Sequence, residues 1–253
     1  IINGVECEPY ITSDYRLMME HADEILVGLD LLMKAAKVDK GYIGIEDNKP
    51  EAIRLLEEKT ANNPNVEIVP LAKKYPQGGE KQLVDAVIRR QVPAPPAIPV
   101  NVGAIVQNVG TAFAVYQAVM KNKPLFERYT TVTGKKVANP GNFLVRMGTP
   151  MKELIDFCGG MPEGDNKVLA GGPMMGKMMA TDAMIDNAVV TKTTGNLLVL
   201  PKDHYLVRRA VKPVQAMIHQ ARTSCIQCRF CTDLCPREQI GHNVKPNQIM
   251  RNL

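Results

Sequence analysis

The sequence predicts an α/β fold in which a mostly parallel sheet, covered by helices, is followed by a smaller β-rich module and a helical C-terminal segment. Three observations lead to this prediction. Helical and strand patterns alternate through the first half of the 253 residues, strand patterns joined by short turns follow from about residue 128, and four cysteines are closely spaced near the C-terminus. Alternating strands and helices are typical of parallel sheets with both faces covered.

The composition is that of an ordinary globular protein with room for two or three domains. Of the residues, 45% are apolar and 23% are charged, and the net charge is +5, with the basic residues dispersed along the chain. This dispersal argues against a nucleic-acid partner. No apolar run approaches the roughly twenty residues that a transmembrane helix needs, and no secretory signal opens the chain. We therefore expect a cytoplasmic protein without a transmembrane segment.

The first helical pattern covers residues 14–37, where apolar residues recur every three or four positions. Ser13 stands where a capping residue is expected. An apolar run at residues 42–45 predicts a short buried strand. The next helix is expected to begin at Asn48 and Pro50, with the asparagine as cap and the proline in the first turn.

The alternation continues to about residue 125, with strands expected at 66–69 and 102–106 and helices at 80–90 and 111–120. In such sheets ligands bind beyond the carboxyl ends of the strands. Each single loop there fits ordinary turn and capping chemistry, but four of them combine small, amide or acidic residues with a helix start, which suits anionic or carbonyl-bearing ligands. These loops are residues 3–9, 46–48, 75–81 and 107–111.

A β-rich module follows. Strands are expected at 129–133 and 143–147, around a turn at 139–141, and a helix over 150–157 leads to another strand at 168–172. This order suggests a small β-grasp module. The β-rich stretch 188–200 is expected to pack back on the first domain.

Near the C-terminus a helix is expected over 213–222 and another from residue 246 onward, with the cysteines between them. Their spacing is typical of ligands to an iron–sulfur cube, and it predicts a [4Fe-4S] cluster. A structural zinc site is disfavoured because its two C-x-x-C pairs are usually separated by a longer loop, and a disulfide framework belongs to secreted chains. The four expected metal ligands are Cys225, Cys228, Cys231 and Cys235, the last followed by Pro236.

In two-cluster ferredoxins the fourth cysteine binds the other cube. The chain ends at Leu253 without a second motif, so we expect it to be a fragment. Cys7 and Cys158 are interpreted as core cysteines. His219 and His242 are interpreted as solvated surface residues, because the cysteines already account for the cluster.

Three short motifs carry a resemblance. Residues 3–9 read Asn-Gly-Val-Glu-Cys-Glu-Pro, residues 78–83 read Gly-Gly-Glu-Lys-Gln-Leu, and residues 107–111 read Gln-Asn-Val-Gly-Thr. They resemble the flavin domain shared by the NADH-oxidising subunit of respiratory complex I, the C subunit of the Rnf complex and the cobalamin reductase of propanediol-utilising microcompartments. The cysteine region, residues 223–237 and 241–244, is most similar to the cobalamin reductase branch.

The resemblance implies a Rossmann-like flavin domain at 1–125, a β-grasp (soluble ligand-binding) domain at 126–185, a connecting β segment at 186–212 and a ferredoxin-type iron–sulfur segment at 213–253. FMN, NADH and [4Fe-4S] clusters are the implied cofactors. The methionine-rich run 171–179 would suit contact with a corrin, but filling a core or partner surface is the favoured interpretation.

The same resemblance implies the site residues. Amides and hydroxyls would hold the flavin, and carboxylates would take ribose hydroxyls. Asn3, Glu6 and Glu8 line the flavin site, with Glu8 near the nicotinamide as the catalytic residue; Asn108 and Thr111 contact the flavin phosphate or ribityl chain; Glu46, Gly79 and Glu80 border the NADH side. The family places a glycine-rich phosphate-binding loop before this point, and its absence would weaken flavin affinity.

The leading hypothesis is an NADH-dependent oxidoreductase that passes electrons through FMN and [4Fe-4S] clusters to cobalamin, serving a corrin-dependent enzyme in the cytoplasm or inside a bacterial microcompartment. The alternative is the C subunit of a membrane-associated Rnf-type ion-translocating complex, with a flavodoxin-like or membrane electron-transfer partner. A third hypothesis is a cluster-bearing relay or docking module without hydride transfer.

Overall fold

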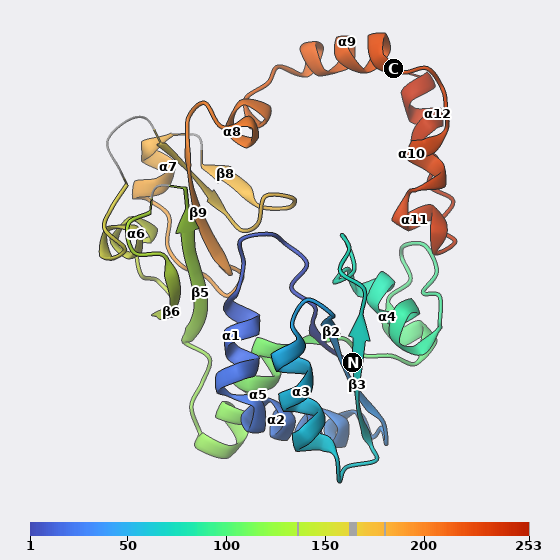
Figure 1. Cartoon of the computed structure of the whole chain (residues 1–253), viewed down its shortest axis with the longest axis vertical. Helices are drawn as coiled ribbons and strands as arrows, with labels where there is room; N and C mark the ends of the chain where they lie inside the picture. Colours follow the sequence, from blue (N-terminus) through green and yellow to red (C-terminus); the bar gives the residue numbers. More distant parts are fainter. Residues whose placement is uncertain (136, 162–165, 180, 253) are drawn as a thin grey trace.

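The computed structural model describes residues 1–135, 137–161, 166–179 and 181–252, which form two sheets and a helical C-terminal arm (Figure 1). The first sheet has the order β3-β2-β1-β4, and its neighbouring strands are all parallel. The carboxyl ends of the strands therefore meet at one edge, as expected for an α/β sheet. The strands are β1 (Ile2–Gly4), β2 (Gly41–Glu46), β3 (Val66–Leu71) and β4 (Gln107–Asn108).

The helices that cover this sheet differ in places from the sequence prediction. The long helix expected over 14–37 is divided at His21, whose φ of −132° and ψ of 36° leave the helical region. Ser13 is the first helical residue and not the cap. The helices are α1 (Ser13–Glu20), α2 (Ala22–Ala36), α3 (Pro50–Thr60), α4 (Glu80–Ile88) and α5 (Val109–Lys121).

Two further predictions about the first domain are wrong in detail. The residue that precedes α3 as its cap is Lys49, not Asn48, whereas Pro50 does open the helix. The strand expected over 102–106 is replaced by a 3-10 helix (Pro99–Val102) that ends at Gly103, which has a φ of +72°. That left-handed turn prevents an extended run, and β4 begins only at Gln107.

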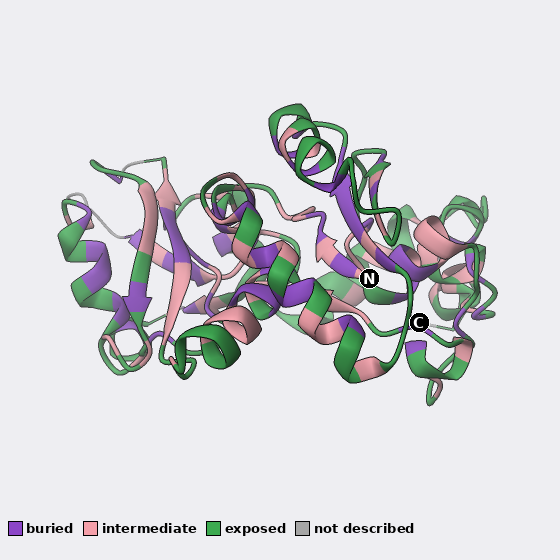
Figure 2. Cartoon of the chain, turned by 90° about the horizontal axis from the view of Figure 1, so that it is seen from below, coloured by how far each residue is buried: buried purple, intermediate pink, exposed green. Residues whose placement is uncertain are grey.

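The core of the first domain lies between the sheet and its helices, where buried residues gather in Figure 2. The closest helix contact is between α2 and α5. A Cβ at Gly28 would lie 2.0 Å from the carbonyl oxygen of Ala112, so only glycine allows this approach. Fully buried Ile25, Ile43 and Leu56 fill the remaining space, each stabilising the fold by about 1.5–3 kcal/mol through removal of apolar surface from water.

The second sheet has five strands in the order β6-β5-β9-β7-β8. Its central pair, β5 and β9, is parallel, and the flanking pairs are antiparallel. This mixed sheet with its helix agrees with the predicted β-grasp module. Its elements are β5 (Glu127–Gly134), β6 (Gly141–Arg146), α6 (Met151–Phe157), β7 (Asn166–Ala170), β8 (Lys177–Met179), α7 (Asp182–Asp186) and β9 (Asn196–Pro201).

The prediction that residues 188–200 pack back on the first domain is wrong. β9 lies between β5 and β7 in the second sheet, and its residues Asn196 to Leu200 are all buried. A continuous apolar run of this kind is expected of a strand covered on both faces.

The C-terminal arm leaves the second sheet, passes over the top of the view in Figure 1 and returns beside the chain that follows α4. No residue of its longest helix is buried. Within the described ranges, no helix has the length and apolar character needed to cross a bilayer. The arm consists of α8 (Tyr205–Ala210), α9 (Val214–Ser224), α10 (Phe230–Asp233), α11 (Pro236–Gln239) and α12 (Pro246–Arg251).

Candidate functional site

A pocket lies at the carboxyl ends of β1, β2 and β3, where the sequence placed a ligand site. Its volume is about 700 Å³, within the range of small-molecule and cofactor sites. The loops after these strands contribute carboxylates, lysines and tyrosines. The lining includes Glu6, Cys7, Glu8, Tyr10, Tyr15, Glu46, Asn48, Lys49, Lys73, Lys74 and Tyr75.

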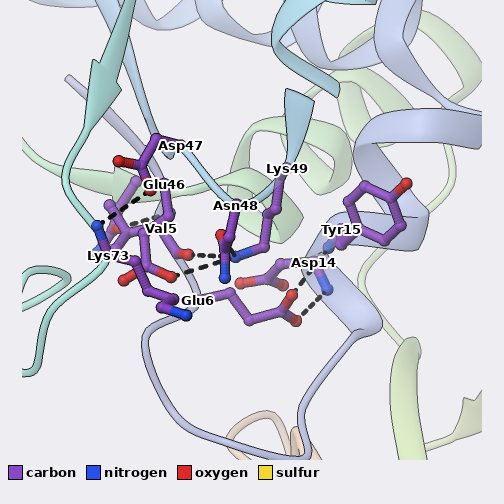
Figure 3. A network of polar contacts seen from close by, with 10 residues as sticks. Val5, Glu6, Asp14, Tyr15, Glu46, Asp47, Asn48, Lys49 and Lys73 are labelled. Atoms are coloured by element: carbon purple, nitrogen blue, oxygen red, sulfur yellow. Dashed lines mark hydrogen bonds and ion pairs between the residues drawn. The ribbon is translucent and has the colours of Figure 1, made fainter. Parts of the chain in front are cut away.

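A buried ion pair joins two of the strand ends (Figure 3). The Lys49 ammonium donates to the carbonyl oxygen of Val5 at 2.8 Å and to Oε2 of Glu46 at 3.4 Å. Glu46 is only 2% exposed, and its other oxygen, Oε1, is buried without a hydrogen-bond partner. Burial raises the pKa of Glu46, while Lys49 opposes that shift. An unpartnered buried acceptor in a pocket wall is a position from which a ligand N–H or O–H could be bound.

Glu6 caps α1 from the neighbouring loop. Its two carboxylate oxygens accept from the backbone amides of Asp14 at 2.7 Å and Tyr15 at 3.2 Å. Burial, and then the charge of Asp14, raise the pKa of Glu6 to about 8. Burial also raises the pKa of Asp14. The pocket therefore has a carboxyl group that can change protonation state near neutral pH.

Glu8 is held by the second module. Its oxygens accept from two consecutive backbone amides in the turn between β7 and β8, from Met174 at 3.0 Å and Met175 at 2.9 Å. A Cβ at Gly172 would lie 2.2 Å from Oε2 of Glu8, so this turn approaches the carboxylate as only glycine allows. The predicted nicotinamide-side residue thus also joins the two modules.

Asn3, Gly79 and Glu80 lie in β1 and at the start of α4, outside the lining of the pocket. The side-chain amide of Asn3 donates to the carbonyl oxygen of Gly78 at 2.9 Å, which ties the end of β1 to the start of α4. Gly79 precedes α4 as its cap, and Glu80 is exposed in the first turn. These residues lie at the predicted sheet edge, but they are not among the pocket's lining residues.

Asn108 and Thr111 border a neighbouring cavity of about 320 Å³. Asn108 caps α5, because its Oδ1 accepts from the amide of Gly110 at 2.7 Å, and its Nδ2 donates to Asp14 at 2.7 Å. Arg128 and Tyr129 close the same cavity from the second module. Of the eight predicted flavin and NADH residues, Glu6, Glu8 and Glu46 line the first pocket, and Asn108 and Thr111 line the second cavity. Asn3, Gly79 and Glu80 line neither of these two cavities.

Sequence reasoning missed Lys49 and Asp14 as site residues. Both lie at helix starts, where polar residues are common, so composition alone did not distinguish them. The spacing does carry a signal for Lys49: it follows the acidic end of an apolar strand by three residues, and a buried carboxylate needs a cationic partner or a shifted pKa.

The four cysteines of the C-terminal motif, all free, lie in the segment between α9 and α11, which is called the cysteine loop here although Cys231 is in the short helix α10. Cys225 and Cys235 are partly covered, whereas Cys228 and Cys231 are exposed. Gln227 and Arg229 have φ values of 56° and 69°, which turn the backbone between successive cysteines. The Gln227 amide donates to Sγ of Cys225 at 3.2 Å.

Among the residues that the structure describes, no three His, Cys, Asp or Glu side chains converge on one metal ion. A cubane cluster makes a different demand, since each cysteine binds a separate iron. Four free thiols with a donor beside one sulfur fit that cluster by their chemistry, and their role as ligands stays a prediction.

Two single-residue interpretations need correction. His242 is 8% exposed and not solvated; its Nε2 donates to the carbonyl oxygen of Val92 at 2.9 Å. Cys7 is only partly buried and lines the pocket, whereas Cys158 is a core cysteine and His219 is exposed, as predicted. Burial raises the pKa of the Cys7 thiol.

Three family models match successive parts of the chain. The Nuo51 FMN-binding domain matches residues 1–117, the SLBB domain residues 129–177 and the 4Fe-4S dicluster domain residues 224–253. The chain therefore carries an FMN-binding domain and a 4Fe-4S domain, as the sequence predicted. A flavin fits the pocket's composition, because the flavin ring offers both donors and acceptors to the Lys49–Glu46 pair.

Curated relatives match nearly the whole chain. The C subunit of the proton-translocating ferredoxin:NAD(+) oxidoreductase complex of Clostridium ljungdahlii is 41% identical over 93% of this chain and 48% of its own length. The Na(+)-translocating counterpart of Acetobacterium woodii is 39% identical over 93% of this chain and 49% of its own. The C subunit of an ion-translocating oxidoreductase complex of Erwinia tasmaniensis is 40% identical over 93% of this chain, with 27% of its own length covered.

The chain thus spans about half the length, or less, of the curated relatives it matches. Among solved structures, NAD+-reducing [NiFe]-hydrogenase in the H2-reduced state matches with a TM-score of 0.63 and 22% identity, over 90% of this chain and 44% of that one. Its air-oxidised state gives a TM-score of 0.65 at the same identity and coverage. These two matches confirm the fold. The relatives support the predicted Rnf-type alternative better than the cobalamin hypothesis, and they give no support to a microcompartment.

Proposed function

Because the chain belongs to the family of Rnf complex C subunits, which is related to the NADH-oxidising subunit of respiratory complex I, we propose that it is the NADH-linked electron-entry part of an Rnf-type ion-translocating complex. In this role it exchanges electrons between NADH and FMN in its first domain and a [4Fe-4S] cluster in its C-terminal arm. The observation that carries the proposal is the pairing, in one chain, of a pocket with a buried Glu46–Lys49 pair and a loop of four free cysteines.

In the pocket, the residues at the strand ends would hold the flavin. When bound, FMN takes a hydride from NADH and releases the two electrons singly. Lys49 would fix the strand ends that face the ring, because its ammonium donates to the carbonyl oxygen of Val5, to Glu46 and to Oδ1 of Asn48. The unpartnered Oε1 of Glu46 is suited to accept from an N–H of the flavin. Glu6, with its pKa raised to about 8, can hold or release a proton near the site.

At the pocket's outer side, carboxylates would bind NADH. Glu8 in the pocket, and Glu80 in the first turn of α4, are suited to accept from ribose hydroxyls. Glu8 would have to make this interaction beside, or in exchange for, its bonds to the amides of Met174 and Met175. Asn108 and Thr111 lie in the adjoining cavity, and we assign them to the phosphate end of the flavin.

In the C-terminal arm, Cys225, Cys228 and Cys231 would bind one cluster and Cys235 the next in the dicluster pattern. The Gln227 amide beside Cys225 would stabilise the thiolate form. The reduction potential of a cluster depends on hydrogen bonds to its sulfurs and on its exposure to solvent. In this exposed loop, few protein contacts would influence that potential.

The electron acceptor distinguishes the two settings. The ferredoxin:NAD(+) relatives favour a ferredoxin-linked, membrane-associated complex. Cobalamin is the second candidate, and it rests on the resemblance of residues 223–237 and 241–244. A relay module that performs no hydride transfer is the third.

The test is an anaerobic assay of the reconstituted chain with FMN and NADH. We expect NADH oxidation coupled to a one-electron dye, transfer between the cluster and reduced or oxidised ferredoxin, and no reduction of aquocobalamin above a control without protein. Cobalamin reduction at the rate seen with the dye would favour the second candidate. Cluster reduction by ferredoxin without any NADH oxidation would leave only the relay function.

A further inference from the structure

The C-terminal arm contacts the first domain through His242, a residue that the proposed function does not include. Ile240 and His242, just after α11, are 7% and 8% exposed, although most of the surrounding arm is exposed. Nε2 of His242 lies 2.9 Å from the carbonyl oxygen of Val92. A carbonyl can only accept, so Nε2 carries the proton. Within the described ranges, this is the one side-chain hydrogen bond between residues 225–252 and residues 1–125.

The accepting segment is itself held rigidly. Val92 is fully buried in a cluster with Val84 and Ala104. The loop that follows it is fixed by Lys81, a residue 9% exposed, whose ammonium donates to the carbonyl oxygens of Pro93 at 2.6 Å and Ala97 at 2.8 Å. Lysine is almost never buried without partners, so this cation organises the loop against which His242 docks.

The two ends of this connection lie at the two proposed cofactor sites. Lys81 is in the first turn of α4 and directly follows Gly79 and Glu80, which are predicted to border the NADH side. His242 follows Cys235 through the short helix α11, and its backbone amide donates to the carbonyl oxygen of Arg237 at 3.0 Å. A continuous set of bonds therefore runs from the NADH-side helix to the cysteine loop.

The cysteine loop is also braced internally. The Thr232 hydroxyl donates to Oδ1 of Asn247 at 2.6 Å and accepts from the Asn247 amide at 3.1 Å, which joins α10 to α12. Segment 230–251 thus has its own connections, and the contact at His242 fixes it to the first domain.

We propose that His242 is a positioning residue for electron transfer: its bond to Val92 holds the cluster segment at a fixed place against the flavin domain. The proposal rests on the proposed function for its electron-transfer part, while the docking contact can be tested without it. Loss of the bond leaves flavin and cluster in place but loosens the geometry between them.

The experiment compares three variants of the whole reconstituted chain. His242→Leu removes the donor and keeps a side chain of similar bulk, His242→Gln restores an N–H at nearly the same reach, and His219→Leu changes an exposed histidine on α9 as the matched control. The rate of hydrogen exchange of the backbone amides in 236–244 reports whether the arm is docked on the first domain. This measurement can be made with or without bound cofactors.

We expect His242→Leu to speed exchange in 236–244 about tenfold, which is the factor that one net hydrogen bond contributes to an opening equilibrium. Cluster content, the spectrum of the chemically reduced cluster and the rate of flavin reduction by NADH remain as in the unsubstituted chain. The rate at which the flavin reduces the cluster falls by about the same factor. His242→Gln brings both rates back most of the way, and His219→Leu changes neither.

Unchanged exchange in His242→Leu would overturn the docking contact. Faster exchange with an unchanged rate of cluster reduction would overturn its role in electron transfer. If the unsubstituted chain shows no reduction of its flavin by NADH, the proposed function fails, and the exchange result still decides whether His242 docks the arm.

Discussion

The strand-end pocket and the cysteine loop carry the chemistry of this chain, and they are built in opposite ways. In the pocket, Glu46 and Lys49 are buried and paired with each other, and burial raises the pKa values of Glu6 and Glu46. In the loop, Cys228 and Cys231 are exposed, and large apolar neighbours face solvent, including Phe230 at 68% and Leu234 at 71% exposed. The protein itself fixes the side chains of the pocket, whereas we expect the order of the cysteine loop to depend on the cluster that it binds.

This difference has an energetic meaning. A buried ion pair is costly to break because the remaining charge has no solvent. Replacing a thiol in an exposed loop changes the stability of the protein little. A cluster that binds only the folded loop would, however, contribute to the order of that loop. Substitutions in the pocket should therefore lower the stability of the protein. Substitutions in the cysteine loop should lower its cluster content and leave its stability without cluster nearly unchanged.

The largest effect is expected for Lys49→Met. It leaves Glu46, only 2% exposed, without its cation, and breaking a buried pair in this way costs about 3–5 kcal/mol. The free energy of unfolding, from denaturant titration, measures this loss. The control is Lys34→Met, whose exposed pair with Asp30 contributes at most about 0.5 kcal/mol.

A double variant, Lys49→Met with Glu46→Leu, sharpens the same test. Removing both charges should recover most of the lost stability, because no buried charge is left unpaired. Equal losses in the single and double variants would contradict the view that desolvation of Glu46 causes the effect.

An intermediate effect is expected at the contact between the two modules. Gly172→Ala places a Cβ 2.2 Å from the Glu8 carboxylate, which must then leave the amides of Met174 and Met175, and loss of such charge-assisted bonds costs about 1.5–3 kcal/mol. Amide exchange at residues 172–176 and the unfolding free energy report the change.

Gly195→Ala is the matched control, since its Cβ meets only ordinary contact at 3.5 Å. Equal free energies of unfolding for Gly172→Ala and Gly195→Ala would contradict the predicted clash. So would full additivity, in which the double variant Gly172→Ala with Glu8→Ala loses the sum of the two single losses in unfolding free energy.

The pH dependence of stability tests the buried carboxyl group of Glu6. A carboxyl whose pKa rises to about 8 on folding binds more protons in the folded than in the unfolded state, so its contribution is present below its unfolded pKa and is lost as the pH rises toward 8. Stability of the chain should thus decline across this window, and Glu6→Gln should flatten the decline. Thermal unfolding at a series of pH values measures it, and parallel curves for the two proteins would show that Glu6 is not responsible.

The smallest effect on stability is expected for Cys231→Ser. The side chain is exposed, so the free energy of unfolding without cluster should change by no more than about 0.5 kcal/mol, while iron and sulfide content falls to the background. Cys158→Ser is the converse case. That thiol is fully buried, so a hydroxyl there should cost about 1–3 kcal/mol and leave cluster content unchanged. Iron analysis and denaturation of both proteins decide the matter.

The sequence predicted most of the α/β order because apolar periodicity and strand-end polar residues are local signals. A pocket lies at the edge of the sheet that the sequence indicated, and Glu6, Glu8 and Glu46 line it, while their roles stay predictions. Prediction from the sequence failed where a side chain makes a contact other than the one its local pattern indicates: Glu6 caps α1 in place of Ser13, and Lys49 pairs with Glu46. The central position of β9 and the burial of His242 also depend on contacts far apart in the chain.

The proposed electron path runs from a flavin in the strand-end pocket to a cluster on the cysteine loop. The most direct test is the anaerobic visible spectrum of the chain with its cluster reconstituted and one equivalent of FMN, recorded over time after NADH is added. We expect flavin absorbance to be lost first and cluster absorbance to be lost after it. Retention of FMN with no bleaching, or bleaching of the flavin while the cluster stays oxidised, would contradict this path.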